Sequence, residues 1–301
     1  MTTNAEPAPR GLYQNAYVLL TLTAAMWGAN TNAGRLAVGE VSPMALTFLR
    51  WIMVVAILAL FYRDRLVADW PVLRQRLPYF ALMGAGGYTG FNAMFYLAAH
   101  YTTAVNLAIL QGAIPVFVFV ISAVLHGTRI RLGHALGMAA TLAGVLIVAG
   151  RGDLAVIRHL TFNIGDLMIL AACFGYALYT IALTRRPEAS GIGIFAAMAG
   201  FACLTSVPLV AIEAFEGTLQ WPTPKGWAVL AFIALFPSFI SQLFYMRGVT
   251  LIGPARAGVF ANLVPVFGAA FAVALLGEPF GWYHAAGLVL VIGGIVWVQR
   301  A

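Results

Sequence analysis

Ten apolar segments, joined by short polar loops, dominate this sequence. A helix of about 20 apolar residues spans the hydrocarbon core of a bilayer, which is about 30 Å thick. Only 9% of the residues are charged, whereas soluble domains carry about 25%. We therefore predict an all-α membrane protein of ten transmembrane helices, and soluble classes of protein are excluded. The predicted helices are 16–36, 44–62, 78–98, 104–125, 134–150, 164–184, 191–212, 226–246, 255–276 and 284–299.

The positive charges predict the orientation of these helices. With the N-terminus placed in the cytoplasm, twelve of the 17 Lys and Arg residues fall on the cytoplasmic side and four on the opposite side. Arg50 lies within a segment. Cytoplasmic loops of membrane proteins carry an excess of Lys and Arg, so we expect both termini in the cytoplasm. The net charge of +7 then follows from membrane topology and requires no nucleic-acid partner.

The second half of the chain resembles the first at an offset of 150 residues. Matching residues are Ile114-Pro115-Val116-Phe117 with Val264-Pro265-Val266-Phe267, His134 with His284, Gly137 with Gly287, and Gly144 with Gly294. Each half contains five segments, and because five is an odd number, the second copy enters the membrane in the opposite orientation. Transporters are commonly built from such inverted repeats, with the substrate site at the repeat interface near the bilayer midplane. A duplicated scaffold or sensor is the alternative interpretation.

Aligned loops have also exchanged their charges, as the positive-inside rule requires of two inverted copies. Loop 63–77, the longest predicted loop, holds four arginines, whereas its counterpart 213–225 holds Glu213, Glu216 and a single lysine. The chain is therefore divided into a disordered cytoplasmic N-terminus at 1–15, a first five-helix repeat at 16–150, a linker at 151–162 and a second five-helix repeat at 163–299.

Three groups of residues form short motifs: Trp27-Gly28-Ala29-Asn30; Ser42-Pro43 leading to Leu49-Arg50-Trp51; and Leu275-Leu276-Gly277-Glu278-Pro279 leading to Ala286-Gly287. These motifs resemble the drug/metabolite transporter superfamily, EamA type. The resemblance covers about 16–299 and implies a transporter built from two five-helix repeats. The first half departs from the family pattern at Thr128, where such repeats usually carry an acidic residue. The tyrosine-rich segments are most similar to those of the family's aromatic amino-acid exporters.

Polar and aromatic side chains inside the segments are the candidate substrate-binding residues, because polar groups are costly in lipid and usually face a cavity or a partner helix. Helical spacing aligns them on shared faces within each segment. The candidates are Trp27, Asn30, Tyr88, Asn92, Tyr96, Gln111, Tyr176, Tyr179, Gln242, Tyr245 and Asn262. For each amide the alternative is an interhelical hydrogen bond, and for each tyrosine it is a place in an aromatic belt.

The depth of these candidates predicts two vestibules related by the repeat symmetry. The outer half of the membrane holds Asn30, Asn92, Tyr96 and Gln111. The inner half holds Tyr179, Gln242, Tyr245 and Asn262. A constriction near Trp27, Tyr88 and Tyr176 separates the two. We expect Tyr88→Ala and Gln242→Ala each to impair transport without loss of folded protein, and unchanged transport in both would place the site elsewhere.

Two prolines and one arginine complete the candidate site. Pro115 and Pro265 are repeat mates, and each frees a backbone carbonyl one turn earlier, so we predict helix breaks with a role in gating. Arg50 lies about two turns inside its segment and must reach the membrane surface or pair with an anionic group. The family resemblance favours a structural anchor for Arg50. The alternative is capture of a substrate carboxylate, which would raise the apparent KM selectively in Arg50→Gln.

All ten acidic residues and all five histidines lie in loops or near segment ends, and Asp166 is the deepest acid. Ion-driven carriers often need a carboxylate at depth, so a facilitator or weakly coupled exporter is preferred. The sequence also lacks a P-loop, a HExxH helix and the paired catalytic groups of an intramembrane enzyme. We therefore predict neither an enzyme nor a cofactor or metal site.

These patterns together predict a multi-pass transporter of a bacterial inner membrane, whose partners are its small-molecule substrate and the lipid bilayer. It moves small amphipathic metabolites, foremost amino acids including aromatic ones, by export or facilitated diffusion through alternating access. Efflux of drugs or lipophilic amines is the main alternative, ahead of a membrane scaffold or sensor. Gly137, Gly144, Gly287 and Gly294 predict close helix packing, either within the bundle or across a homodimer. A monomer and a homodimer are both compatible with the sequence.

Overall fold

The computed structural model describes residues 11–98, 101–102, 107, 110–127, 131–153, 155, 163–277 and 279–301, and all regular structure in these ranges is helical. Seven helices of the described part are long and apolar enough to cross a membrane, and Ala113–Leu125 is a shorter apolar helix. This confirms an all-α membrane fold, and the described helices fit two inverted five-helix repeats.

The first repeat begins within the predicted N-terminal segment. Residues Leu12–Gln14 form a turn of 3-10 helix, η1, and the side chain of Asn15 accepts hydrogen bonds from the first turn of α1. The segment 1–15 was predicted to be disordered, and its residues 1–10 lie outside the described ranges. The further elements are α1 (Ala16–Ala37), α2 (Pro43–Phe61), α3 (Arg63–Leu73), η2 (Arg74–Arg76), α4 (Leu77–Leu82), η3 (Met83–Gly90), α5 (Phe91–Ala98), α7 (Ala113–His126) and α8 (Leu132–Ala149).

The second repeat follows the same order in the opposite orientation. Its elements are α10 (Ile164–Ala182), η4 (Leu183–Arg185), α11 (Gly191–Phe215), α12 (Pro224–Ile233), η5 (Ala234–Ile240), α13 (Ser241–Ile252), α14 (Pro254–Gly258), η6 (Val259–Asn262), α15 (Leu263–Leu276) and α16 (Trp282–Arg300).

The segment 63–77, predicted to be a loop, is largely helical, and this part of the prediction is wrong. Leu66 and Leu73 of α3 pack against the hydrophobic core, whereas Arg63 and Arg65 are exposed. The amphipathic pattern is short and rich in charge, so the count of apolar residues did not reveal the helix. Tertiary packing of one apolar face stabilises it.

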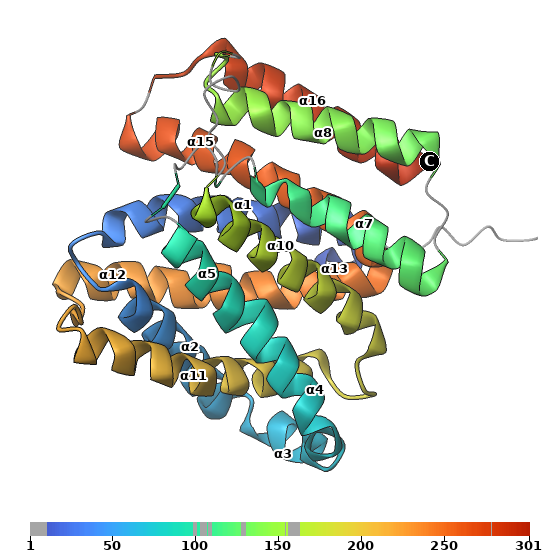
Figure 1. The fold of residues 1–301 in the computed structure, drawn as a ribbon. Coiled ribbons are helices and arrows are strands. Elements are labelled where there is room, and N and C mark those ends of the chain that lie inside the picture. The colour runs from blue at the N-terminus through green and yellow to red at the C-terminus, as the bar shows by residue number, and fades with distance from the viewer. Residues whose placement is uncertain are drawn as a thin grey trace, which may run out of the picture.

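Each helix of one repeat packs against helices of the other, and the partners are exchanged by the repeat symmetry. α1 packs against α13 and α15, and its counterpart α10 packs against α5 and α7. α2 packs against α11, and α8 packs against α16. In Figure 1, α8 and α16 lie together at one edge of the bundle, and α2 and α11 lie together at the other edge. The central helices between these pairs are therefore the interface of the two repeats.

Glycines allow the very close approach of α8 and α16. A Cβ atom added to Gly294 would lie 2.5 Å from the carbonyl oxygen of Gly137, and one added to Gly144 would lie 2.8 Å from the carbonyl oxygen of Gly287. Small residues at such positions let membrane helices approach until their backbones touch. The four glycines predicted to mediate packing therefore do so within this chain, and this glycine face is not available to a second copy.

A π-helical segment widens the third membrane helix of each repeat. η3 lies between α4 and α5, and η5 lies between α12 and α13. η3 contains four glycines, and η5 contains Pro237, which lacks the N–H that a regular helical turn would use. Such segments are rare and often lie at functional sites. Here they carry Tyr88 and Ser238 to the interface of the two repeats.

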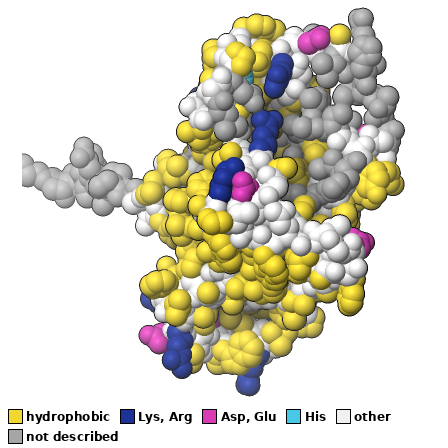
Figure 2. All heavy atoms as spheres, turned by 90° about the vertical axis from the view of Figure 1, so that its left-hand side faces the viewer, with side chains coloured by type: hydrophobic (Ala, Val, Ile, Leu, Met, Phe, Trp, Pro, Cys, Tyr) yellow, Lys and Arg dark blue, Asp and Glu magenta, His cyan; other side chains and the backbone are white. Residues whose placement is uncertain are grey.

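Large apolar side chains point outward around the bundle. Leu82, Val124, Phe215 and Val289 are each exposed over more than two thirds of their surface. Figure 2 shows hydrophobic side chains over much of one face, with the charged groups few and scattered. Because apolar surface of this extent is unfavourable in water, it faces the hydrocarbon of a bilayer.

A buried carboxylate joins α11 to the beginning of α2. Glu213 accepts hydrogen bonds from the Ser42 hydroxyl at 2.5 Å, the Met44 N–H at 2.8 Å and the Ala45 N–H at 3.2 Å. It thereby satisfies free N–H groups at the N-terminus of α2, where a negative charge is also favourable. A similar contact lies at the other end of α11. There the Ser190 hydroxyl, at the N-terminus of α11, donates to Asp69 of α3.

We expect Glu213→Gln to lower the free energy of unfolding by about 1–3 kcal/mol, because the amide provides one acceptor oxygen in place of two and leaves a buried donor unpaired. Thermal unfolding of the purified protein in detergent measures this effect. The matched control is Glu216→Gln, an exposed residue at the end of the same helix that should change stability little. Equal stability of the two variants would show that the Glu213 contacts contribute nothing.

Candidate substrate site

Five aromatic side chains meet at the interface of the two repeats. The ring of Trp27, from α1, lies 5.8 Å from that of Tyr176 and 5.2 Å from that of Tyr245, measured between centroids. Tyr176 lies 5.2 Å from Tyr179, and Tyr179 lies 5.3 Å from Tyr88. We call this group the aromatic cluster. Its members come from α1, η3, α10 and α13, so both repeats contribute.

Polar groups link the aromatic cluster across the repeats. The hydroxyl groups of Tyr88 and Tyr179 are 3.1 Å apart, and the Tyr179 hydroxyl donates to Gln242 Oε1 at 3.4 Å. Trp27 Nε1 donates to Ser241 Oγ at 2.9 Å. This network joins η3 and α1 of the first repeat to α10 and α13 of the second. A relative movement of the repeats must therefore break or rearrange it.

The π-helical segment η3 is shaped to receive the ring of Tyr179. A Cβ atom added to Gly87 would lie 2.6 Å from two carbon atoms of that ring. Glycine at position 87 thus allows the ring to pack directly against the backbone of η3. On its other side, Tyr88 stacks on Trp51, with ring centroids 4.7 Å apart and an interplanar angle of 8°. Through this stacking, Tyr88 connects the aromatic cluster to Trp51 of α2.

Trp51 is a member of this site that the sequence analysis did not include among its candidates. Its ring is 1% exposed, and its Nε1 has no hydrogen-bond partner within the described part of the chain. The available signal was a tryptophan in the middle of an apolar segment, far from the membrane surface where tryptophan usually lies. Thr47, four residues earlier on the same helical face, was a further signal.

Arg50 connects α2 to the second π-helical segment. Its side chain is buried, Nε donates to Ser238 Oγ at 2.9 Å, and the guanidinium lies over the ring of Trp51, 5.5 Å from the centroid. Ser238 in turn donates to the carbonyl of Ile233 at 2.7 Å. These contacts favour the structural anchor over capture of a substrate carboxylate. Measuring the protein level and the apparent KM of Arg50→Gln distinguishes the two roles.

Among the described candidates, no hydrogen bond links Asn30, Asn92, Gln111 or Asn262 to the aromatic cluster. The Asn262 side chain donates to Thr141 Oγ1 of α8 at 2.7 Å, which is the interhelical hydrogen bond named as the alternative. Gln111 donates to the carbonyl of Leu107, in its own segment, at 3.2 Å. Asn30 and Asn92 are partly exposed, and Asn30 Oδ1 is buried without a hydrogen-bond partner within the described ranges. The side chain of Tyr96 lies outside what the structure describes.

The two prolines occupy equivalent places in the repeats. Pro115 is the third residue of α7, and Pro265 is the third residue of α15. A proline in the first turn is tolerated, because the N–H groups there have no partner within the helix. Upstream of Pro265, the predicted helix 255–276 is divided into α14, the 3-10 turn η6 and α15. Upstream of Pro115, Gly112 precedes the first turn of α7.

The described candidates differ in burial according to their expected depth. Asn30, Asn92 and Gln111, expected in the outer half, are partly exposed. Tyr179, Gln242, Tyr245 and Asn262, expected in the inner half, are all buried. The candidates expected in the inner half are therefore more buried than those expected in the outer half, and the two vestibules stay a prediction.

The acidic residues nearest to the membrane interior lie at helix ends. Asp166, which is buried, accepts from the Thr102 hydroxyl at 2.5 Å and from the Asn163 N–H at 2.9 Å, at the N-terminus of α10. Glu213 lies at the end of α11, as described above. Among the described residues, no group of three or more His, Cys, Asp or Glu side chains could hold a metal ion.

Comparisons with known proteins place this arrangement in a family of transporters. The model of the EamA-like transporter family matches residues 14–150 and again residues 163–300. An "Uncharacterized transporter YyaM" from Bacillus subtilis (strain 168) is 27% identical over 285 residues, which cover 94% of this chain and 92% of the relative. A "Probable amino-acid metabolite efflux pump" from Salmonella typhimurium is 26% identical, covering 92% of both chains.

Two further matches extend this result. A "Probable terminal-alkyne amino-acid exporter" from Streptantibioticus cattleyicolor is 25% identical over 74% of this chain and 73% of the relative. A solved crystal structure with 21% sequence identity covers 95% of this chain and 96% of its own, with a TM-score of 0.76, and therefore shares the fold. The family model covers each five-helix half separately. The chain is thus a member of the EamA-like transporter family.

Proposed function

We propose that this protein exports small amphipathic metabolites across the bacterial inner membrane, foremost amino acids with aromatic or apolar side chains. The observation that carries this proposal is the aromatic cluster at the repeat interface, with Gln242 hydrogen-bonded to one of its tyrosines. Aromatic rings provide flat apolar contacts for a ring or an alkyl chain. Neutral amide and hydroxyl groups provide both donors and acceptors, as the ammonium and carboxylate of an amino acid require.

The unpaired polar atoms around the site support the same class of substrate. Trp51 Nε1 can donate, and the Tyr176 hydroxyl can donate or accept, and both are buried without a partner within the described ranges. A buried polar group without a hydrogen bond is unfavourable by about 1–3 kcal/mol. A substrate that supplies both an acceptor and a donor would remove this cost, whereas a purely apolar compound would not.

Alternating access of the two repeats explains how such a substrate crosses. In the proposed orientation, the buried residues Tyr179, Gln242 and Tyr245 close the cytoplasmic side, and the partly exposed Asn30 and Asn92 face the outside. Opening toward the cytoplasm would separate the hydroxyl groups of Tyr88 and Tyr179. It would also expose Tyr179 and Tyr245, the members of the aromatic cluster expected in the inner half of the membrane. The inverted repeats allow the second conformation to be reached by exchanging the roles of the two halves.

The names of two relatives agree with this substrate class, since one is called an amino-acid metabolite efflux pump and one a terminal-alkyne amino-acid exporter. No carboxylate belongs to the aromatic cluster, so we propose a facilitator or a weakly coupled exporter. Lipophilic amines are the second candidate substrate, because the faces of the clustered rings can attract a cation.

Counterflow in proteoliposomes tests this proposal. Vesicles loaded with unlabelled phenylalanine should take up labelled phenylalanine faster than vesicles without the protein, and an added pH gradient should not cause accumulation. A screen with alanine, a nucleoside and a cationic dye measures the selectivity. Uptake of the dye alone would favour efflux of lipophilic amines, gradient-driven accumulation would contradict the facilitator, and no uptake of any amino acid would overturn the proposed substrate class.

A further inference from the structure

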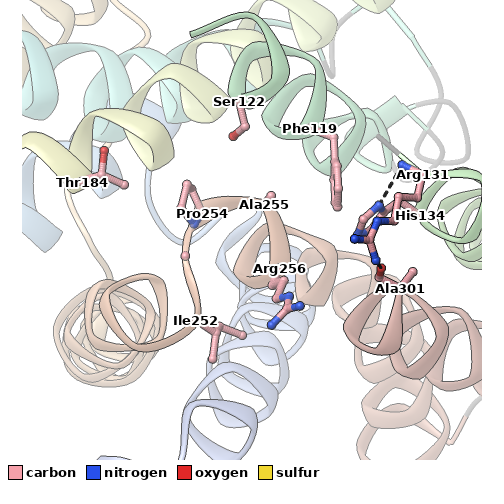
Figure 3. Close-up of a pocket in the computed structure, with 11 residues that line it drawn as sticks. Phe119, Ser122, Arg131, His134, Thr184, Ile252, Pro254, Ala255, Arg256 and Ala301 are labelled. Carbon is pink, nitrogen blue, oxygen red and sulfur yellow. Dashed lines mark hydrogen bonds between the residues drawn. The ribbon is translucent and has the colours of Figure 1, made fainter. Parts of the chain in front are cut away.

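A cavity outside the aromatic cluster is lined by residues of α7, α8, η4, α13 and α14 and by Ala301, which follows α16. It has a volume of about 580 Å³, and its polar lining includes Arg131, His134, Arg256 and Ser122. Figure 3 shows these side chains around one space, with the Ser122 hydroxyl pointing toward it. Arg131 belongs to the first repeat and Arg256 to the second. Among the described residues that line this cavity, none is Asp or Glu.

The polar side chains of this cavity are arranged to donate hydrogen bonds. Ser122 is 2% exposed, and its hydroxyl has no partner within the described part of the chain. His134 Nδ1 accepts from the Arg131 N–H at 3.1 Å, so a neutral ring carries its proton on Nε2 and can donate. Arg131 donates one N–H to the Ala301 oxygen at 2.7 Å, and a guanidinium has five N–H donors in all. Two guanidinium groups, an imidazole and a hydroxyl are a set of donors that suits phosphate oxygens.

An apolar groove continues this cavity along α16. The groove has a volume of about 440 Å³, is lined by Gly293, Val296, Trp297 and Arg300, and shares Ala301 with the cavity. Gly293 has no atom of another segment within 4 Å of the position of a Cβ, and Trp297 is 49% exposed. Because this face of α16 is apolar and outward, it contacts lipid chains. The two hollows together therefore fit a molecule that combines a phosphate group with a hydrocarbon chain.

We propose that this corner is a binding site for an anionic phospholipid. Its phosphate lies between Arg131 and Arg256, and one acyl chain follows the groove beside Trp297. The charge bias of the loops places this corner at the cytoplasmic surface, where basic pockets between membrane helices bind acidic headgroups. Since the two arginines come from different repeats, the bound lipid would also join the repeats at this surface.

Lipid binding to the purified full-length protein in a neutral detergent tests the proposal. Added phosphatidylglycerol should raise the melting temperature and remain bound in native mass spectrometry, whereas phosphatidylcholine should do neither. Arg131→Gln and Arg256→Gln should each weaken the apparent affinity about fivefold, and the double variant about 25-fold. The matched control is the double variant Arg63→Gln and Arg65→Gln, at two exposed residues of α3, which should bind like the unaltered protein.

A variant of the groove separates a lipid from a free anion. Trp297→Ala should weaken binding of phosphatidylglycerol and leave any effect of inorganic phosphate unchanged. If inorganic phosphate raises the melting temperature as much as the lipid, and Trp297→Ala changes nothing, the cavity binds a free anion and the lipid proposal is wrong. Binding equal to that of the unaltered protein in both single arginine variants would also overturn it, and these variants keep the test decisive if the double variant does not fold.

Discussion

Replacing Tyr179 by phenylalanine is expected to reduce amino-acid uptake at least about tenfold while the protein stays folded. The ring remains, so its packing against Gly87 and Tyr176 is preserved. The hydroxyl is lost, and with it the contacts to the Tyr88 hydroxyl and to Gln242 Oε1. Leaving such buried groups unpaired changes the free energy of this conformation by about 1–3 kcal/mol. The balance between the two conformations of the carrier shifts accordingly.

The initial rate of counterflow in proteoliposomes, normalised to the amount of reconstituted protein, measures this change. Tyr283→Phe is the matched control, because it makes the same substitution in α16, away from the aromatic cluster, and should transport at the unaltered rate. Thermal unfolding of both variants shows whether either has lost stability. Equal rates for Tyr179→Phe and Tyr283→Phe would exclude the hydroxyl network from the transport cycle.

The burial of Tyr88 changes how its role should be tested. Its side chain is 2% exposed and stacks on Trp51. Tyr88→Ala would leave a cavity, and removal of a buried aromatic ring is unfavourable by about 3–5 kcal/mol. The sequence alone predicts that this variant stays folded, whereas the burial of the ring in the structure predicts a loss of stability. Tyr88→Phe separates the role of the hydroxyl from the packing of the ring.

Replacing Gly294 by valine is expected to separate α8 from α16 and to cause loss of most of the folded protein. A Cβ at position 294 would lie 2.5 Å from the carbonyl oxygen of Gly137 and 2.9 Å from the backbone nitrogen of Thr141. Backbone atoms cannot rotate away as the end of a side chain can, so the helices must move apart. Overpacking in a tightly packed interior is unfavourable by about 1–3 kcal/mol, and contact along much of the two helices is lost with it.

The neighbouring residue provides a matched control for this prediction. Gly293 lies in the same turn of α16, and no atom lies within 4 Å of the position of its Cβ. Gly293→Val therefore carries the same change in helix propensity without the clash. Size-exclusion chromatography and thermal unfolding in detergent should show a folded Gly293→Val and an aggregated or strongly destabilised Gly294→Val. Similar behaviour of the two variants would mean that the close contact of α8 and α16 is unnecessary.

The five members of the aromatic cluster are recognisable in the sequence, because they are polar or aromatic residues in segments where lipid otherwise demands apolar ones. Trp27, Tyr88, Tyr176, Tyr179 and Tyr245 all meet at the repeat interface. Helical spacing alone could not decide which amides accompany them. Gln242 joins the cluster and Asn262 pairs with Thr141, although both are amides in apolar segments of the second repeat. The difference lies in which neighbouring helix each side chain meets.

The sequence by itself determined the lipid surroundings of the chain and the inverted relation of the two halves. These properties follow from the length of apolar segments and from the exchange of charge between aligned loops, which are local or periodic features of the chain. Tertiary structure alone decided the π-helical segments, the stacking of Trp51 on Tyr88 and the cavity that unites Arg131 with Arg256. Each of these depends on contacts between segments far apart in the chain, whose geometry no single segment encodes.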